Sequence, residues 1–428
     1  MTTKPSEILG MNARNQLYLS LNSAKAKSIC KSKYATKVLL TNQNIATAEV
    51  YGVLATQEDV NDFPWHKMAE NFVIKPTNGH AGKGIIAFKK QHADQQHWTD
   101  VVGRVWSLAD LKLHCYDILE GQYSTHGSRH HIIVEERVPI HPKLLKYTYK
   151  GTPDIRVIVF NKVPVMALLR LPTKESEGRA NQSQGAIGVG IDIATGITTY
   201  AAAHKTQLIQ YLPGTKKKLN GIKIPFWNQL LKTAVQAAEA AELVYAGIDL
   251  FIHKDKGPMV VELNSQPGLS IQIANQAGLR RRLQRVADLN VLNDDHGVRI
   301  GQALFAESFA DKIKAKEGLA IVEPREELTV FGEDRQERIA PALINTGRYR
   351  SAIASQLAEE LGLIDLDDLL WFQQEQGEGK VPVVEVAFQL KDRQLETTML
   401  VSKKLNRRSH KLELGRKDLP GFLVGIKD

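Results

Sequence analysis

The stretch MVVELNSQPGL (residues 259–269) places an acid and an amide two positions apart at the end of an apolar run. In a β-strand, side chains alternate between the two faces, so Glu262 and Asn264 point to the same side. A carboxylate and an amide carbonyl are oxygen ligands of the kind that Mg²⁺ prefers. A polar strand end before a Pro-Gly turn explains this segment alone equally well, so its neighbours must decide.

A second run brings another carboxylate toward the same point. The segment AGIDLFI (246–252) carries Asp249, and the following HKDKGP predicts a hairpin that leads into the strand of Glu262. In adjacent antiparallel strands, Asp249 can face the same point as Glu262 and Asn264. A buried Asp among apolar neighbours is costly unless it is paired or bound to a metal, which favours a metal site.

A glycine-rich loop follows a predicted strand, FVIKP (72–76), that ends near Lys75. The loop NGHAGKG contains Gly79, Gly82, Lys83 and Gly84. Glycines allow backbone N–H groups to approach an anion, and lysines add charge, so the loop is suited to cover phosphates. It is not a Walker A loop, because two residues rather than four separate Gly79 from Gly82 and no Ser or Thr follows Lys83. A simple turn would have the same composition.

Length and composition indicate a folded protein with more than one domain. The chain has 428 residues, which is too long for a single ordinary hydrophobic core. Its composition, 43% hydrophobic and 24% charged, is typical of a globular protein. Apolar runs are interrupted well before 18 residues, and the opening MTTKPSEILG lacks a signal-peptide pattern, so we expect a cytoplasmic protein without a membrane partner. The two cysteines, Cys30 and Cys115, show neither a metal-binding nor a redox spacing.

The net charge of +9 favours acidic partners without choosing among them. The basic runs lie at 216–218, 280–282, 403–404 and 407–408. They lack the interleaved aromatic residues that stack on bases, so we expect no nucleic-acid partner and interpret these runs as solvated faces.

Hydrophobic periodicity predicts an α+β chain. We expect mostly helices over residues 1–50, then a strand at 48–54 and a polar linker. A strand is expected at 131–138, a hairpin turning at Asn161-Lys162, and a helix at 227–242. Residues 279–316 fit helices, and beyond about 320 the composition changes to short strands and turns. The predicted segments are an N-terminal helical extension (1–30), a main domain (31–280), a helical closing segment (281–320) and a β-rich module (321–428).

The order of these short signatures resembles the ATP-grasp ligases, particularly the RimK-related branch that adds glutamate to protein or cofactor carboxylates. The signatures are FVIKP, the glycine-rich loop, IVEERV, DIRV, RAN, AGID and VVELNSQPGL, spread over roughly residues 30–275. Any one of them is weak, and their common order makes the likeness specific. The resemblance implies an ATP-grasp fold, with two α+β subdomains that clamp ATP. It also implies an ADP-forming carboxylate–amine ligase that makes an amide through an acylphosphate.

The resemblance implies roles for individual residues. The positions that match phosphate-contacting groups are Lys33, Lys75 and the loop residues Gly79, Gly82, Lys83 and Gly84. The backbone around Glu135 and Glu136 matches the strand that reads adenine. Asp249, Glu262 and Asn264 match ligands of two Mg²⁺ ions, which Mn²⁺ could replace. The positions that match groups around the acceptor carboxylate and the transferred phosphoryl group are Arg156, Arg170, Arg179 and Asn181. Each arginine taken alone could equally be a surface ion-pair partner.

Two departures from the family pattern leave the substrates open. Gln182 and Ser183 stand where close relatives have Leu-His, and the N-terminal Rossmann-like domain of many relatives is expected to be truncated or replaced by helices. The implied partners are an amino acid and a carboxylate acceptor, such as an acidic peptide or protein. The alternative is an ATP-binding scaffold without turnover, with a peptide-binding C-terminal domain, and the intact metal ligands argue against it.

The segment ALINTGRYRSAI (342–353) resembles the active-site loop of retropepsin-like aspartic proteases, and HKLELGRKDLPGFLV (410–424) resembles a late strand and turn of that fold. Asn345 stands where those proteases have Asp, and the sequence shows no second carboxylate to replace it. Aspartic proteolysis needs two carboxylates that share a proton, so the resemblance implies a module without protease activity. A strand followed by a turn explains INTG nearly as well. If the resemblance holds, we expect the module to bind peptide or to form a homo-oligomer.

Overall fold

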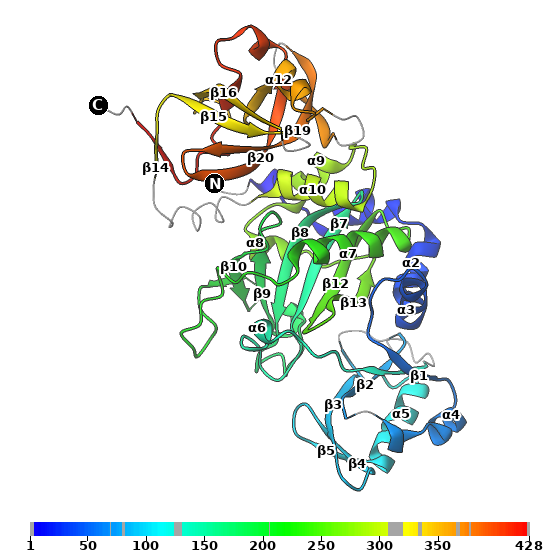
Figure 1. Cartoon of the computed structure of the whole chain (residues 1–428). Coiled ribbons are helices and arrows are strands. Elements are labelled where there is room, and N and C mark those ends of the chain that lie inside the picture. The colour runs from blue at the N-terminus through cyan, green and yellow to red at the C-terminus, as the bar shows by residue number, and fades with distance from the viewer. Residues whose placement is uncertain are drawn as a thin grey trace. The chain divides into compact units, whose positions relative to one another are not determined.

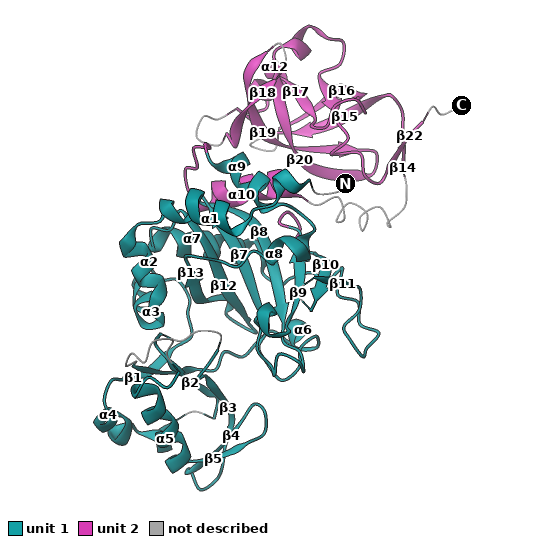
Figure 2. Ribbon diagram, turned by 180° about the vertical axis from the view of Figure 1, so that it is seen from behind, with its two compact units in different colours: residues 1–192, 196–287 teal, residues 193–195, 288–428 magenta. Residues whose placement is uncertain are grey.

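A computed structural model describes residues 4–68, 70–78, 82–123, 131–204, 206–306, 320–332, 336–364, 369–375 and 378–425. The chain forms two compact units, shown in Figure 2. Unit 1 comprises Met1–Asp192 and Gly196–Ala287, and unit 2 comprises Ile193–Thr195 and Asp288–Asp428. Within the described ranges, no helix is long and apolar enough to cross a membrane.

Unit 1 begins with helices and continues into a six-stranded sheet (Figure 1). The helices are η1 (Pro5–Glu7), α1 (Met11–Leu17), η2 (Leu19–Leu21), α2 (Ala24–Lys31), α3 (Lys33–Asn42), α4 (Gln57–Asp62), η3 (Trp65–Lys67) and α5 (Leu108–Leu119). The strands, in sheet order, are β1 (Val50–Leu54), β6 (Ile132–Glu136), β2 (Phe72–Pro76), β3 (Ile86–Gln91), β4 (His97–Asp100) and β5 (Val105–Ser107).

The segment after β1 is helical, so the expectation of a polar linker was wrong. The Thr56 hydroxyl accepts a hydrogen bond from the backbone N–H of Asp59 (3.1 Å), and the Asp59 carboxylate accepts one from the backbone N–H of Thr56 (2.9 Å). This reciprocal pair satisfies two donors that the first turn of α4 cannot satisfy itself. The Thr-x-x-Asp spacing is the local signal that predicts this helix.

Alternation along β2 separates a core face from a cleft face. Phe72 and Ile74 are fully buried in an apolar cluster that includes Leu111 of α5, whereas Val73 and Lys75 line a cleft. Full burial of one large apolar side chain stabilises the fold by about 1.5–3 kcal/mol. Burial of Phe72 and Ile74 therefore determines the orientation of β2 and which of its residues face the cleft.

A seven-stranded sheet forms the rest of unit 1. In sheet order its strands are β11 (Gln207–Ile209), β10 (Thr198–Ala203), β9 (Ile187–Ile191), β8 (Val163–Leu171), β7 (Asp154–Phe160), β12 (Tyr245–His253) and β13 (Gly257–Asn264). Between β7 and β8, Asn161 and Lys162 both have positive φ (49° and 61°), as a two-residue type I′ turn requires. The remaining helices of the unit are α6 (Pro142–Leu145), η4 (Gln182–Gln184), α7 (Trp227–Ala240), α8 (Ile271–Asn275) and α9 (Leu279–Val286), and α7 packs on β12 and β13.

The N-terminal helices are hydrogen-bonded into unit 1. A guanidinium N–H of Arg14 donates to the Pro267 carbonyl (2.9 Å), and the Asn22 amide donates to the Tyr245 carbonyl (2.7 Å). These bonds tie residues of the predicted extension to the end of the sheet that carries Asp249. The predicted limits of the domains stay predictions.

Unit 2 is rich in β-structure, as expected. Its elements are α10 (Asp294–Phe305), β14 (Ala320–Val322), β15 (Arg325–Phe331), β16 (Glu337–Ile344), β17 (Ala352–Ala354), α12 (Ser355–Glu360), β18 (Trp371–Glu375), β19 (Gly379–Leu390), β20 (Arg393–Ser402), η7 (Lys404–Arg407), β21 (Leu412–Leu414) and β22 (Phe422–Val424). The sheet order is β15-β16-β21-β17-β20-β19-β18, and β15 also pairs with β19. The ring formed by β15, β16, β21, β17, β20 and β19 is therefore closed, and β18 lies outside it. Strands β14 and β22 form a separate parallel pair.

Candidate active site

A cleft of about 1650 Å³ lies in unit 1. One wall uses alternate residues of four neighbouring strands, namely Leu168 and Arg170 of β8, Asp154 and Arg156 of β7, Asp249 and Phe251 of β12, and Glu262 and Asn264 of β13. Residues two apart in a strand share a face, so the strand pattern itself gathers these polar groups. Single small-molecule pockets measure about 300–1,000 Å³, so this cleft has room for a nucleotide and a second substrate.

Asp249 is held by two arginines in the wall of this cleft. Arg156 donates two hydrogen bonds to its carboxylate, both 2.7 Å long, and Arg170 donates a third of 2.8 Å. Arg170 also donates two bonds of 2.5 Å to Asp154. Burial opposes ionisation of Asp249, yet the charges of Arg156 and Arg170 lower its pKa. Burial raises the pKa of Asp154 to about 6 against the charge of Arg170.

The oxygen-bearing residues fit a magnesium site by their chemistry. Glu262 makes no hydrogen bond or ion pair with a described residue, and it lines the cleft beside Asn264. The Asn264 amide nitrogen donates to Asp249 (3.2 Å), which leaves its carbonyl oxygen as an acceptor. Among the described residues, no three His, Cys, Asp or Glu side chains come close enough to hold a metal. Two carboxylates and one amide therefore suit an ion that is completed by phosphates and water.

A buried group of charges lies near β2 and β6. Lys75 contacts Glu135 at 2.6 Å and Lys37 contacts it at 2.8 Å, and each of these side chains is less than a tenth exposed. Burial alone would raise the pKa of Glu135, but the two lysine charges lower it. Lys33 lines the cleft, and burial lowers the pKa of its ammonium against the charge of Glu262. Lys37 is a member of this group that was not predicted, and its position four residues after Lys33 puts both on one helix face.

The backbone of Glu135 is enclosed by the sheet. Glu135 is paired with Val50 of β1 on one side and with Val73 of β2 on the other, so its backbone lies inside the sheet. The adenine-reading role of the backbone around Glu135 and Glu136 stays a prediction. Glu136 donates its N–H to Glu49 (2.8 Å), whereas the Val138 N–H donates to none of the described residues, and Val138 lines the cleft.

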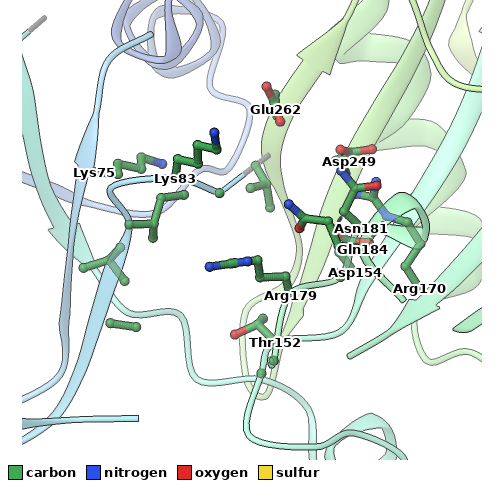
Figure 3. A pocket seen from close by; sticks show the side chains of 18 of the residues that line it. Lys75, Lys83, Thr152, Asp154, Arg170, Arg179, Asn181, Gln184, Asp249 and Glu262 are labelled. Atoms are coloured by element: carbon green, nitrogen blue, oxygen red, sulfur yellow. Dashed lines mark hydrogen bonds and ion pairs between the residues drawn. The ribbon is translucent and has the colours of Figure 1, made fainter. Parts of the chain in front are cut away.

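The described part of the glycine-rich loop needs its glycines. Gly82 and Gly84 have φ angles of 73° and 74°, and a Cβ on Gly84 would lie 2.9 Å from the ring of Tyr123. Gly79 lies outside the described residues. Lys83 lines the cleft, and Figure 3 shows Lys75 and Lys83 on the side facing Asp249 and Asn181. Cationic groups and oxygen ligands therefore face each other.

The remaining predicted residues lie on the loop between β8 and β9. Arg179 extends into the space between the two sides in Figure 3, and its guanidinium lies 3.6 Å from the exposed Glu177. Asn181 accepts hydrogen bonds from the backbone and hydroxyl of Ser183 (3.1 and 3.0 Å) and so caps η4. Gln182 accepts a bond from the Ser270 hydroxyl (2.7 Å), which ties this loop to the start of α8. Arg179 and Asn181 thus border the cleft, whereas Arg156 and Arg170 are bound to acids in its wall.

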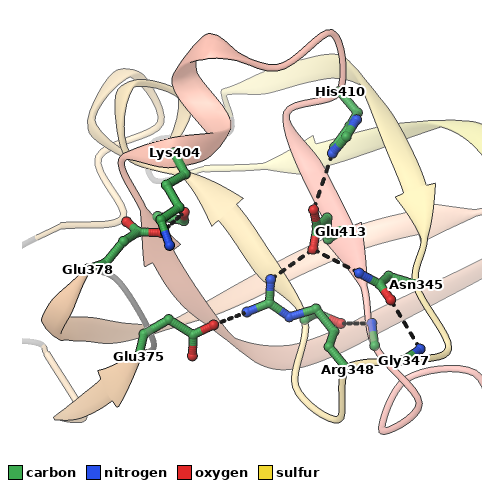
Figure 4. A network of polar contacts seen from close by, with 11 residues as sticks. Asn345, Gly347, Arg348, Glu375, Glu378, Lys404, His410 and Glu413 are labelled. Carbon is green, nitrogen blue, oxygen red and sulfur yellow. Dashed lines mark hydrogen bonds and ion pairs between the residues drawn. The ribbon is translucent and has the colours of Figure 1, made fainter.

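Unit 2 contains a second cluster around Asn345, drawn in Figure 4. The Asn345 amide donates to Glu413 (3.2 Å), Arg348 donates to the same oxygen (2.8 Å), and His410 lies 3.3 Å from the other. Glu413 is thus a carboxylate beside Asn345 that the sequence pattern did not reveal. Burial opposes ionisation of Glu413, but Arg348, His410 and Asn345 together lower its pKa. A second bond from Arg348 reaches Glu375 (3.1 Å).

A comparison with protein families assigns the chain. The model described as sugar-transfer associated ATP-grasp matches residues 12–288, which is more than half of the chain. The chain belongs to this ATP-grasp family. Membership confirms the α+β ATP-grasp fold expected from the signatures and makes ATP the expected ligand of the cleft. The assignment to the RimK-related branch stays a prediction.

Solved structures of ATP-grasp proteins show low similarity. They include PsnB with a minimal precursor (TM-score 0.35, 15% identity, 61% of this chain and 60% of that chain). D-cycloserine synthetase DcsG has a TM-score of 0.34 at 15% identity, over 61% of this chain and 70% of that chain. D-alanine–D-alanine ligase from Bacillus anthracis with ATP has a TM-score of 0.33 at 16% identity, over 69% and 70%. The chain thus spans about 60% of the length of PsnB, and none of the curated proteins matches it. Values of this size identify no substrate.

Proposed function

We propose that unit 1 is an ATP-dependent carboxylate–amine ligase that forms an amide bond through an acylphosphate. The observation that carries the proposal is the pair of opposed groups in one cleft: Lys75 and Lys83 face the wall that holds Asp249 and Glu262 (Figure 3). Phosphoryl transfer requires positioning and charge neutralisation rather than a protein nucleophile, and these groups supply both.

The residues of the chain bind and orient the substrates. Lys33 and Lys75 attract the phosphates, and the loop at Gly82–Gly84 covers them and excludes water. The backbone at Val138 receives the adenine. Asp249, Glu262 and Asn264 would hold Mg²⁺, which neutralises phosphate charge when bound.

The proposed chemistry has two steps. A carboxylate oxygen of the acceptor attacks the γ-phosphorus, and the bond to ADP breaks. The amine of the incoming amino acid then attacks the acyl carbon, phosphate leaves and the amine loses a proton. Arg179 and Asn181 are positioned to orient the acceptor. Neither thiol is a ready nucleophile, because burial raises the pKa of Cys30 to about 11 and that of Cys115 to about 12.

The test is phosphate release by the purified protein with ATP and Mg²⁺. Amino acids and short acidic peptides are added singly and in pairs, and products are identified by mass spectrometry. We expect phosphate release that depends on a pair, with a product whose mass equals both partners less water. ATP binding without release across the whole panel would contradict the ligase and favour a scaffold.

We also propose that unit 2 is a retropepsin-like module without protease activity, which binds peptide or forms a homo-oligomer. The closed ring of strands and the turn after β16 support this assignment. An aspartic protease needs a carboxyl pair that shares one proton. Asn345 cannot ionise, and Glu413 is bound by Arg348, so the pair cannot form. Asn345→Asp tests the proposal: any peptidase activity that it gained would support a degenerate protease.

A further inference from the structure

The arm of unit 1 that comprises residues 196–226 contains no Asp or Glu. A second segment, 139–152, also lacks both, although about one residue in nine of the chain is acidic. The arm carries Lys216, Lys217 and Lys218 together, and all three are exposed.

The described part of the arm is an ordered hairpin. Tyr211 forms an antiparallel bridge with Lys218, and backbone hydrogen bonds join Leu212 to Lys217 (2.9 Å) and Leu219 to Gln210 (3.0 Å). Figures 1 and 2 both show it extending from the edge of the sheet where β10 and β11 lie. The three lysines are therefore held on a defined structure.

Contacts connect this hairpin to the cleft. The Lys217 ammonium donates to the Lys146 carbonyl (2.6 Å), and the Tyr149 N–H donates to the Pro172 carbonyl (3.0 Å). Gly151 lies so close to Gly178 that an added Cβ would meet its carbonyl oxygen at 1.8 Å. The cations that line the cleft in this region are Lys150, Lys174 and Arg179. We call the exposed cations Lys146, Lys150, Lys174, Arg179 and Lys216–Lys218 the basic track.

The lysines of the basic track have no acidic partner among the described residues. Two other lysines of unit 1 are paired, Lys25 with Glu242 and Lys162 with Glu239, both at 2.8 Å. The acids that border the track are already engaged: Glu175 lies 3.1 Å from His204, and Glu177 lies 3.6 Å from Arg179. The positive charge of the six lysines of the track is therefore available to an external anion.

We propose that the basic track docks an acidic polypeptide and directs one of its carboxylates into the cleft. This proposal names a substrate class for the proposed ligase, and it rests on that function for what happens to the carboxylate in the cleft. A polypeptide fits better than a nucleic acid because the reaction proposed for the cleft takes a carboxylate, which a polypeptide supplies and a nucleic acid does not.

The test measures fluorescence anisotropy of a labelled twelve-residue glutamate-rich peptide with the full chain in the absence of ATP. The variant Lys216→Ala/Lys218→Ala keeps the Lys217 contact with Lys146. The control Lys25→Ala/Lys162→Ala removes the same number of charges from paired positions. We expect the first variant to weaken binding about tenfold and the control to change it less than about twofold, because local rather than net charge concentrates the ligand.

Several results would overturn the proposal. Equal weakening in both variants would reduce the effect to net charge, and equal binding of a glutamine peptide would remove the acidic requirement. Tighter binding of a twelve-nucleotide oligouridine that responds to Lys216→Ala/Lys218→Ala would assign the track to nucleic acid. Phosphate release with small acids but no peptide binding would overturn the docking proposal alone. Peptide binding without phosphate release in any mixture would leave docking supported and contradict the ligase.

Discussion

The two units each contain a carboxylate bound by arginine and asparagine, but in different surroundings. In unit 1 the Asp249 side chain is 4% exposed, and its donors are Arg156, Arg170 and Asn264. In unit 2 the Glu413 side chain is 16% exposed, and its neighbours are Arg348, His410 and Asn345. Both carboxylates have lowered pKa values for the same reason, which is the charge and hydrogen bonds of these neighbours against the effect of burial.

The neighbours of the Asp249 cluster and of the Glu413 cluster distinguish a candidate site in unit 1 from a structural network in unit 2. Beside Asp249 stands Glu262, which makes no hydrogen bond or ion pair with a described residue and faces a cleft. In unit 2, Arg348 joins Glu413 to Glu375, so the carboxylates there are already paired. A similar pairing of charges therefore occurs in two settings. In unit 1 a further acid without a described partner, Glu262, lies beside the pair in the cleft and makes a candidate site. In unit 2 the acids are paired, and the cluster connects strands.

The largest effect on stability is expected for Asp249→Ala. This substitution leaves Arg156 and Arg170 buried with fewer partners, so the free energy of unfolding should fall by about 3–5 kcal/mol. Denaturant titration followed by tryptophan fluorescence measures it, since four of the five tryptophans lie in unit 1. Asp249→Asn keeps the shape and a hydrogen-bond acceptor and should cost less. A loss below about 1 kcal/mol for Asp249→Ala would show that the arginines do not depend on this acid.

A nucleotide should stabilise one unit and not the other. A non-hydrolysable ATP analogue with Mg²⁺, at 100 times its dissociation constant, should add about 2.7 kcal/mol to unit 1, because only the folded cleft binds it. Hydrogen exchange of peptides from each unit measures the stabilisation of unit 1 and that of unit 2 separately. Removal of Mg²⁺ with a chelator should reduce the protection of unit 1. Protection of unit 2 alone would place the nucleotide site elsewhere.

A smaller effect is expected for Glu413→Gln. The substitution should lower the stability of unit 2 by about 1 kcal/mol at pH 7, because Arg348 and His410 lose a charged acceptor. The folded state lowers the pKa of Glu413, so its contribution is present above the unfolded pKa and is lost as pH falls through the folded value. The difference between variant and wild type should therefore shrink in acid.

Urea-dependent hydrogen exchange of β16 and β21 at pH 7 and in acid measures this difference. Glu396→Gln on β20, an acid for which no ion pair with a described residue is found, is the control and should show no such pH dependence. A constant difference at all pH values would mean that the charge of Glu413 is irrelevant and only its shape matters.

The sequence predicted those parts of the site that depend on local pattern. Alternation in AGIDLFI and VVELN placed Asp249 and Glu262 on neighbouring strands, and the structure pairs them directly. The pair of Asp154 and Arg170 could not be predicted in the same way, because the register shifts by one residue between Ile158 and Val159, and symmetry about the Asn161-Lys162 turn would place Leu169 opposite Asp154.

Contacts between distant segments left no local signal. Glu413 reaches Asn345 because β21 lies parallel to β16, and parallel neighbours need a long connection whose path no turn motif reveals. Lys37 reaches Glu135 across almost one hundred residues, and its helix position indicates only the face it shares with Lys33. Burial of these charges depends on packing, so sequence patterns could name the residues of the site more readily than their partners.

The smallest effect on stability, and the sharpest test of the comparison, is expected for Glu262→Ala. Because Glu262 has no described hydrogen-bond or ion-pair partner, its loss should change the free energy of unfolding by less than about 0.5 kcal/mol. Phosphate release should nevertheless fall at least about 100-fold, because an electrostatic group at the reacting phosphate is removed. The control Glu239→Ala, an acid paired with Lys162, should leave release unchanged. Full activity of Glu262→Ala would remove the unpaired acid from the site, and the distinction between the two carboxylate clusters would then rest on burial alone.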